Sequence, residues 1–558
     1  MREYNVILKK DVDYDSFWND MESDTDGGKL YIPNRAVEYT NERPTSLRQC
    51  WYRLTDEEAE IVRQDDRVLA VEIPPDHRDD IQIELRGVLG TPDLYEKPAG
   101  NSGPYMNWGL VRSLRKENIY EDSSAPPIGY EYVLDGTGVD VVIQDSGLQV
   151  DHPEFEDFNG NSRVQQIDWY VASGIAGTQS VNHYRDFDGH GTHVAATAAG
   201  KYYGWAKNSR VYSQKLSGLE GSGDSGTGIS TTDAFDTIKG WHMAKSGSRP
   251  TIVNMSWGYF LSYSTVSAIH YRGTSYTGAS IDDLGERYAF GLIPYTLNGG
   301  TTYITNPRIA SIDADVEEMI DAGIVVTIAA GNRSHKIDVE GGLDWDNSAS
   351  LSGGNSSAYS AEYPGGQVTF NRGSSPSSPF AIIVGNIDDS TTDPAGTASF
   401  VDKKANSSER GDGVDIYAPG TNIMSACSTT YDTTNFSPQN YEANNDGNAS
   451  FKQMSISGTS MAAPQVAGVA ALVAQVLNPL VTSSFVTSSA FPAAVKSVIL
   501  NNASASLYFT NQDDDFTNLR STLSTEAGKI LFNPHSAKEP FKLIGGSLSF
   551  NGVGLEIR

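Results

Sequence analysis

A serine in the segment GTSMAAP, Ser460, lies among small residues and could act as a nucleophile. A serine hydroxyl is nearly inert at neutral pH unless a general base takes its proton. No histidine lies near this segment in the sequence. If Ser460 does chemistry, the fold must therefore bring it a base, and a group that orients the base, from distant parts of the chain.

The segment DGHGTHVAATAAG supplies a candidate base, His190, at the expected start of a helix. An imidazole is the side chain best suited to take and return a proton at neutral pH. It must be held in one tautomer by an acceptor on its other ring nitrogen. Asp145, at the end of the strand-like VVIQD, is the candidate for that acceptor. The chain order Asp145, His190, Ser460 is one of the orders in which such a triad occurs.

Four near-continuous apolar runs predict the strands that position these residues. They cover residues 139–145, 251–258, 323–332 and 380–387. Such runs are typical of strands buried on both faces of a parallel sheet. The sequence therefore predicts an α/β fold, with a doubly wound, mostly parallel sheet and helices on both faces. Sites in this architecture form at the carboxyl ends of strands, where Asp145, Ser256 and Asn332 stand.

Composition and pattern divide the chain into four parts. Residues 1–77 alternate strand-like and helix-like segments and predict a small α+β domain. Residues 78–127 are rich in Pro, Gly, Asn and Ser and predict a linker. Residues 128–510 carry the βα alternation, and residues 511–558 predict a small β appendage whose role the sequence does not reveal. Long polar stretches that predict surface insertions interrupt the third part at residues 259–306, 333–379 and 425–454.

Six segments follow one another along the third part: QDSGLQVDHPEF, GHGTHVAATAAG, NMSWG, IAAGN, VDIYAPG and GTSMAAPQVAGVAAL. In this order they resemble the signature segments of the subtilase family of serine proteases. The segment GKYYGWAKNSRVYSQKL is similar to the proteinase K branch, because no long loop interrupts the run after the histidine-bearing helix. The resemblance implies a subtilisin-like fold and an endopeptidase that works through an acyl-enzyme.

The resemblance also implies a role for each matching residue. Ser460 would be the nucleophile, His190 the general base and then acid, and Asp145 the group that orients it. Asn332 would hold the oxyanion together with the Ser460 amide. Two backbone edges would pin an extended substrate strand between them by β-augmentation. These edges are Gly221, Ser222 and Gly223 on one side, and Ser256, Trp257 and Gly258 on the other.

Residues 1–77 are similar to the inhibitor prodomains of the same family, through the segment YRLTDEEAEIVRQDDRVLAVEIPPD. The resemblance implies a folding chaperone that then acts as an intramolecular inhibitor. Flexible connections are the places where chains are cut. We therefore expect the protein to cleave itself between His77 and Asn107.

No cofactor is expected for catalysis, and calcium is expected only as a structural ion of the kind that many subtilases bind. Glu154 lies where subtilisins carry an acidic calcium ligand, although the loop that supplies most of that site is absent. Asp186 and Asp188 are candidate oxygen ligands or part of a solvated loop; we favour the loop, and no metal ligand is assigned. His193 is expected to have a structural role. The two cysteines, Cys50 and Cys427, are expected to be reduced packing thiols.

Charge and chain ends limit the partners. The 558-residue chain has 41 Lys and Arg against 70 Asp and Glu, a net charge of −29. This balance argues against nucleic acid and anionic membrane as partners and leaves polypeptides as the expected substrates. No signal peptide or membrane-spanning segment is recognised. We therefore expect action inside the producing cell, or release by lysis or in a particle.

Two alternative interpretations remain open. The run GSGDSG (221–226) satisfies a dinucleotide-binding pattern, but that pattern alone is weak. A structural or binding protein, for example a particle component, could also use a subtilase scaffold without its chemistry. A fluorophosphonate label, which requires an activated serine, distinguishes that protein from an active endopeptidase.

Overall fold

The structure is a computed structural model that describes most of the chain. The described residues are 1–22, 37, 39–43, 45–46, 48–85, 107–114, 132, 134–221, 227–245, 249–263, 265–278, 294–297, 300–352, 362–363, 366–389, 402–430, 442–443, 450–478, 488–503, 528–533, 548–550 and 553–555.

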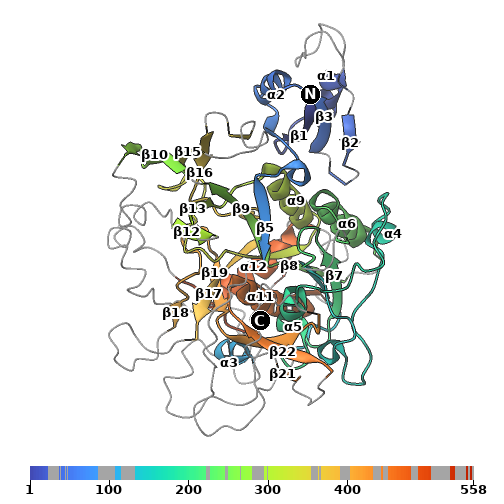
Figure 1. Ribbon diagram of the computed structural model, residues 1–558. Helices are drawn as coiled ribbons and strands as arrows, with labels where there is room; N and C mark the ends of the chain where they lie inside the picture. Colours follow the sequence, from blue (N-terminus) through green and yellow to red (C-terminus); the bar gives the residue numbers. More distant parts are fainter. Residues whose placement is uncertain are drawn as a thin grey trace.

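A seven-stranded sheet forms the centre of the molecule (Figure 1). Its order is β18-β17-β14-β8-β6-β7, and β19 also pairs with β17. All pairs are parallel except β17 with β18. The four predicted apolar runs supply β6, β8, β14 and β17, so the predicted fold class is confirmed. The strands are β6 (Asp140–Asp145), β7 (Arg210–Lys215), β8 (Thr251–Met255), β14 (Val325–Ala329), β17 (Ile382–Asp388), β18 (Lys403–Lys404) and β19 (Ile416–Pro419).

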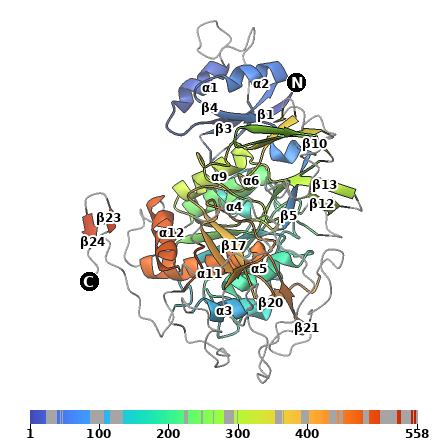
Figure 2. The ribbon, with the colours of Figure 1, turned by 90° about the vertical axis from the view of Figure 1, so that its left-hand side faces the viewer.

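Helices cover both faces of this sheet, as Figures 1 and 2 show. Helix α11 packs on β8, β14, β17 and β19, with α5 and α12 beside it, and α6 and α9 pack together on the opposite face. By length and composition α11 could cross a membrane, but 83% of its apolar window is buried in the protein. The helices are α4 (Trp169–Ser173), α5 (His190–Ala199), α6 (Thr231–Ala244), α9 (Ala310–Asp321), α11 (Thr459–Leu477) and α12 (Ala490–Asn502).

The N-terminal domain, residues 1–77, has its own sheet and its own apolar core. The sheet order is β2-β3-β1-β4, and α1 (Tyr14–Glu22) and α2 (Asp56–Arg63) pack against it. Thr55 caps the start of α2 through a reciprocal hydrogen-bond pair with Glu58. The domain lies against α6 and α9 (Figure 2). The strands are β1 (Arg2–Leu8), β2 (Tyr39–Glu42), β3 (Gln49–Leu54) and β4 (Val68–Glu72).

The predicted insertions contain regular structure, contrary to our expectation of structureless loops. The first and second insertions share a sheet of order β11-β10-β15-β16, which has a small apolar core of its own. The first also supplies β12, β13 and most of β9 in the sheet of order β12-β13-β9-β5, whose strand β5 (Ile81–Leu85) comes from the predicted linker. The third supplies β21 and most of β22 beside β20. The strands are β9 (Trp257–Tyr263), β10 (Thr265–Tyr271), β11 (Thr274–Thr277), β12 (Pro294–Leu297), β13 (Gly300–Thr305), β15 (Ser348–Ser352), β16 (Gln367–Thr369), β20 (Ile423–Cys427), β21 (Glu442–Ala443) and β22 (Lys452–Ile456).

Two boundaries differ from the sequence-based expectation. The predicted linker 78–127 contains β5 (Ile81–Leu85), which pairs with β9, and α3 (Trp108–Arg112), which is fully buried. The expected C-terminal appendage includes residues 528–533, which lie beside β19 through a bridge between Tyr417 and Ile530. Its end holds a separate hairpin of β23 (Leu548–Phe550) and β24 (Val553–Leu555). The part of the chain that packs with the domain of the central sheet is therefore longer than predicted: it includes β5 and α3 on the N-terminal side and residues 528–533 on the C-terminal side.

Candidate active site

His190 and Asp145 meet at the carboxyl ends of the strands of the central sheet. Asp145 is the last residue of β6 and His190 is the first residue of α5, and both side chains are fully buried. The ring Nδ1 of His190 lies 2.8 Å from Oδ1 of Asp145. The close approach depends on Gly191, because a Cβ there would lie 2.2 Å from the Gly147 carbonyl oxygen. The predicted orienting pair is therefore assembled with hydrogen-bonding geometry.

Two further carboxylates surround the start of α5. Asp186 is buried and accepts hydrogen bonds from the amides of Gly189 at 2.7 Å and Thr192 at 2.9 Å. Asp188 accepts from the His190 amide at 3.2 Å. The expectation of a solvated loop is wrong, because these oxygens replace the missing side-chain cap of α5. The spacing of an aspartate ahead of GHGT was the one signal in the sequence for this capping role.

These charges compete with burial at His190. Burial, the largest single influence, lowers the pKa of His190, but the neighbouring acids, led by the Asp145 carboxylate, together outweigh it and the pKa is raised above 6.5. Asp188 and Asp186 act in the same direction. Burial also raises the pKa of Asp188 to about 8, partly opposed by His190. The imidazolium form of His190 is thus favoured by three neighbouring acids.

Ser460 is the second residue of α11 and is fully buried. Its Oγ donates to the carbonyl oxygen of Ser256 at 3.0 Å, and the Ser256 hydroxyl donates to the Ser460 carbonyl at 3.0 Å. No hydrogen bond joins Ser460 to His190 among the described residues, where Nε2 of His190 is buried without a partner. Asp145 is therefore hydrogen-bonded to His190, and Ser460 to Ser256. No described hydrogen bond links the first pair to the second.

Asn332 follows β14 and is held against the start of α11. Its Oδ1 accepts from the Thr459 amide at 2.9 Å and from the Thr459 hydroxyl at 3.0 Å. The Gly331 amide donates to the same hydroxyl at 3.1 Å. Thr459 therefore binds the amide oxygen of Asn332 and leaves the amide nitrogen out of these two hydrogen bonds. Thr459 directly precedes Ser460 and was not identified from the sequence.

One predicted substrate edge is occupied by the chain itself. β5 runs antiparallel to β9, with Glu84 opposite Gly258 and Leu85 opposite Trp257. The Trp257 side chain is buried in the core and donates to Gln144, so only its backbone is available at the edge. On the other predicted edge, Gly221 is described, and Ser222 and Gly223 lie outside the described residues.

The carboxylates considered for calcium have other partners. Oε2 of Glu154 accepts from the amides of Tyr202 and Tyr203, and the cations of Arg163 and Lys207 lie close enough to oppose the rise that burial causes in its pKa. The described residues contain no cluster of three metal-ligating side chains. These groups do not fit a calcium site, and calcium binding stays a prediction.

Three other predicted side chains have structural surroundings. Nε2 of His193 lies 2.9 Å from the Ile423 carbonyl and 3.0 Å from that of Met454, and the residue is fully buried. Burial lowers the pKa of His193 to about 3, so it stays neutral. Cys50 and Cys427 are buried free thiols in separate apolar cores. All three expectations are confirmed.

Comparison with known proteins relates the chain to the subtilase family. The profile of the subtilase family matches residues 136–528. A cuticle-degrading serine protease of Arthrobotrys oligospora is 27% identical over 366 residues, which are 65% of this chain and 57% of that protein. An extracellular serine proteinase of a Thermus species is 25% identical over 457 residues, 82% of this chain and 73% of that protein. The chain thus spans little more than half of the first of these relatives.

Among solved structures, a cold-adapted subtilisin-like serine proteinase is 22% identical with a TM-score of 0.41, covering 76% of this chain and 97% of the other. Fervidolysin from Fervidobacterium pennivorans, a keratinolytic enzyme related to subtilisin, is 16% identical with a TM-score of 0.47. It covers 98% of this chain and 62% of that one.

Proposed function

The chain belongs to the subtilase family, and from that premise we propose that it is a serine endopeptidase with Ser460 as nucleophile. The observation that carries the proposal is the buried pair of Asp145 and His190, 2.8 Å apart, at the same sheet edge as the start of α11. A fully buried imidazole beside a carboxylate is suited to a proton transfer that water cannot intercept.

The reaction would proceed in two transfers. Oγ of Ser460 turns from the Ser256 carbonyl toward His190, loses its proton to Nε2 and attacks the scissile carbonyl. Asp145 stabilises the imidazolium, and the Asn332 amide nitrogen with the Ser460 amide holds the oxyanion. His190 then gives the proton to the leaving amine, which leaves an acyl-enzyme. A water molecule, activated by the same imidazole, releases the acid and restores Ser460.

A fluorophosphonate probe tests this activity on the prodomain-free protein. We expect wild type to be labelled and to cleave peptides, while Ser460→Ala, His190→Ala and Asp145→Ala each lose most peptidase activity. Double variants should lose little more, because the three groups act as one unit. A folded, prodomain-free wild type that is not labelled would instead favour a structural or binding protein on a subtilase scaffold.

We further propose that the N-terminal domain is an inhibitory prodomain. Three features support this: the separate core of the domain, its contacts with α6 and α9, and the pairing of β5 with the predicted substrate edge. The register ends at Leu85 opposite Trp257, one residue from Ser256, whose carbonyl oxygen holds Oγ of Ser460. A strand in this position competes directly with a substrate strand.

Self-cleavage would then fall after Leu85 and before Asn107. The upstream limit is the end of β5, and the downstream limit is Asn107, whose amide is buried against Tyr203 and Gln465. We therefore propose a window that starts later than the sequence-based limit at His77. Mass spectrometry should find a fragment ending within this window in wild type, and the Ser460→Ala chain should stay whole. A Ser460→Ala chain cut at the same place in purified form would assign the cleavage to another protease.

A further inference from the structure

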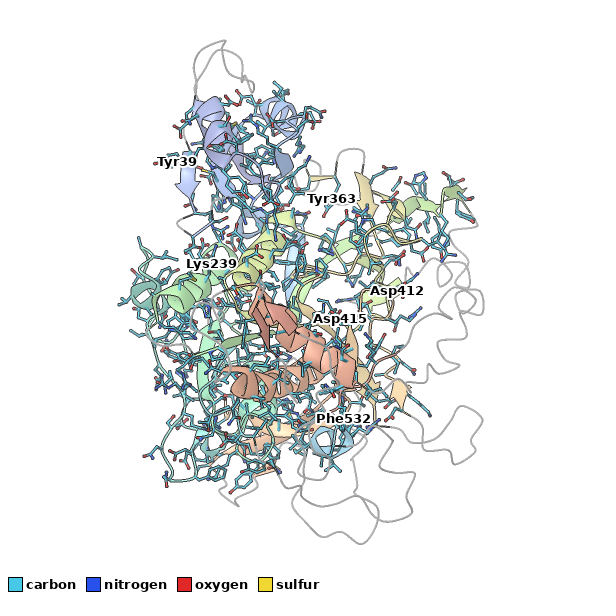
Figure 3. The ribbon with its side chains drawn as sticks, turned by 180° about the vertical axis from the view of Figure 1, so that it is seen from behind. Tyr39, Lys239, Tyr363, Asp412, Asp415 and Phe532 are labelled. Carbon is cyan, nitrogen blue, oxygen red and sulfur yellow. The ribbon has the colours of Figure 1, made fainter. Side chains whose placement is uncertain are left out.

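Two residues of the second insertion, Glu362 and Tyr363, contact the segment that connects β4 to β5. The Ile73 amide donates to the Glu362 carboxylate. The Arg78 guanidinium lies 3.8 Å from Oε2 of Glu362, donates to the Tyr363 hydroxyl at 3.4 Å and stacks over the Tyr363 ring at 5.5 Å. Figure 3 labels Tyr363 on the side of this insertion that faces the N-terminal domain. These contacts lie outside the predicted substrate groove.

The contact between Arg78 and Glu362 is charged and largely shielded from solvent. The side chain of Arg78 is 2% exposed and that of Glu362 is 10% exposed. Asp80 also binds Arg78 through two hydrogen bonds, at 2.7 and 3.0 Å. Removing one partner of a buried charge pair leaves the other charge unpaired in a poorly solvated place, which costs far more than losing a surface ion pair.

We propose that Glu362 and Tyr363 form a clamp that recognises Arg78 and controls how fast the cleaved N-terminal domain leaves the enzyme. The proposal rests on the proposed function, since it concerns release of the prodomain. Its ligand class is a peptide segment in which a short 3-10 helix, Pro75–His77, is followed by a buried arginine two residues before an aspartate. The clamp therefore holds the domain at a place separate from the substrate groove and from the contacts with α6 and α9.

The clamp has a consequence for the order of events. Cleavage after β5 frees one end of the chain but breaks none of the contacts of Ile73 or Arg78. The lifetime of the complex is then set by contacts away from the groove, namely the buried pairs of Arg43 with Asp236 and Asp315 and the clamp on Arg78. Loss of the clamp should change the dissociation rate more than the rate of the cleavage itself.

The first experiment does not depend on activity. In the full Ser460→Ala chain, hydrogen exchange at the Ile73 amide should be at least tenfold faster in Glu362→Ala than in the parent, because the amide loses its acceptor. Lys10→Ala is the matched control, since the Lys10 side chain is 35% exposed and pairs with Glu317 and Asp321 at the same interface, beside the Phe380 ring. Equal protection of Ile73 in all three chains would overturn the clamp.

The second experiment measures release in the self-processed wild-type complex. Arg78→Ala and Glu362→Ala should each shorten the half-time of dissociation, by at least tenfold for Arg78→Ala, whereas Lys10→Ala should change it less than twofold. Unchanged half-times would overturn control by the clamp even if exchange at Ile73 had risen. If wild type never cleaves itself or fails to react with the fluorophosphonate, the proposed function fails, and the exchange experiment still decides whether the clamp exists.

Discussion

At the scale of single residues, the candidate site depends on opposing effects at His190. Burial lowers the pKa of His190, whereas Asp145, Asp188 and Asp186 raise it, and the net direction is upward. A general base must be neutral to accept a proton. Peptidase activity should therefore fall as the pH drops through the raised pKa of His190, and the neighbouring acids set where that fall occurs.

Asp188→Asn tests this balance. The substitution keeps an acceptor for the His190 amide and removes an acid that favours the imidazolium. The pKa of His190 should fall, so the acid limb of the pH profile of kcat/KM should move to lower pH while the plateau changes little. The pKa of Asp188 is itself raised to about 8, so the two proteins should have similar activity at pH 6, where wild-type Asp188 is protonated, and differ most as the pH rises toward 8. An unmoved limb would contradict the assigned coupling.

Asn332 can be tested by two substitutions that separate its amide oxygen from its amide nitrogen. Asn332→Leu removes both, whereas Asn332→Asp keeps an acceptor for Thr459. Losing one oxyanion donor in subtilisin, a member of this family, lowers kcat by about 10²–10³-fold, and we borrow that magnitude. Both variants should lose kcat with little change in KM. Normal turnover in Asn332→Asp would show that the residue only holds Thr459 in place.

At the scale of elements, helix α9 is completed by a residue from another domain. Its own N-cap residue, Ile309, provides no side-chain acceptor. Glu72, the last residue of β4, accepts from the amides of Ser311 at 2.8 Å and Ala310 at 3.1 Å. A carboxylate at a helix N-terminus also interacts favourably with the helix dipole. The N-terminal domain thus satisfies polar groups that the catalytic body leaves open.

Glu72→Ala should therefore destabilise α9. The loss of a helix cap costs about 1 kcal/mol, so hydrogen exchange in the first turn of α9 should be faster and the thermal midpoint of the Ser460→Ala chain lower. Glu57→Ala, an exposed acid on α2, is the matched control. If both variants behaved alike, the contact between Glu72 and α9 would not contribute to stability.

At the scale of the whole molecule, docking of the N-terminal domain buries Glu362 close to another acid, Glu72. Burial raises the pKa of Glu362 to about 7, Arg78 opposes the rise, and Glu72 adds to it. Arg63 also opposes it, and Asp80 lies on the far side of Arg78. When the domain leaves, Glu362 becomes exposed and its pKa should return toward the ordinary 4.5. Docking is therefore coupled to proton uptake at Glu362.

The sign of this coupling gives a testable pH dependence. A group whose pKa is raised in the docked state strengthens docking at low pH and ceases to do so as the pH rises through the raised pKa. This contribution should be complete below about pH 4.5 and lost above about pH 7. The cleaved domain should leave faster at pH 8 than at pH 5, and Glu362→Gln should flatten the dependence. Release that slows with rising pH in wild type would contradict the assignment.

The sequence by itself determined the elements and the residue types of the candidate site. The apolar runs that end at Asp145 and before Ser256 and Asn332 predict strands of a parallel sheet, because strands buried on both faces need continuous apolar residues. Parallel strands end at one edge, so their carboxyl ends bring these residues together whatever loops intervene. The helix that bears Ser460 was predictable from its long run of small apolar residues, which suits a helix buried on all sides.

Only the tertiary structure decided which groups complete these elements. No pattern in the sequence shows that Thr459 holds Asn332 or that Glu72 caps α9, since each partner comes from a separate turn or element. The pairing of β5 with β9 was also hidden, because a short edge strand owes its conformation to its neighbour rather than to its own residues. Non-local hydrogen bonds and burial, which depend on the whole fold, placed these residues and defined the clamp on Arg78.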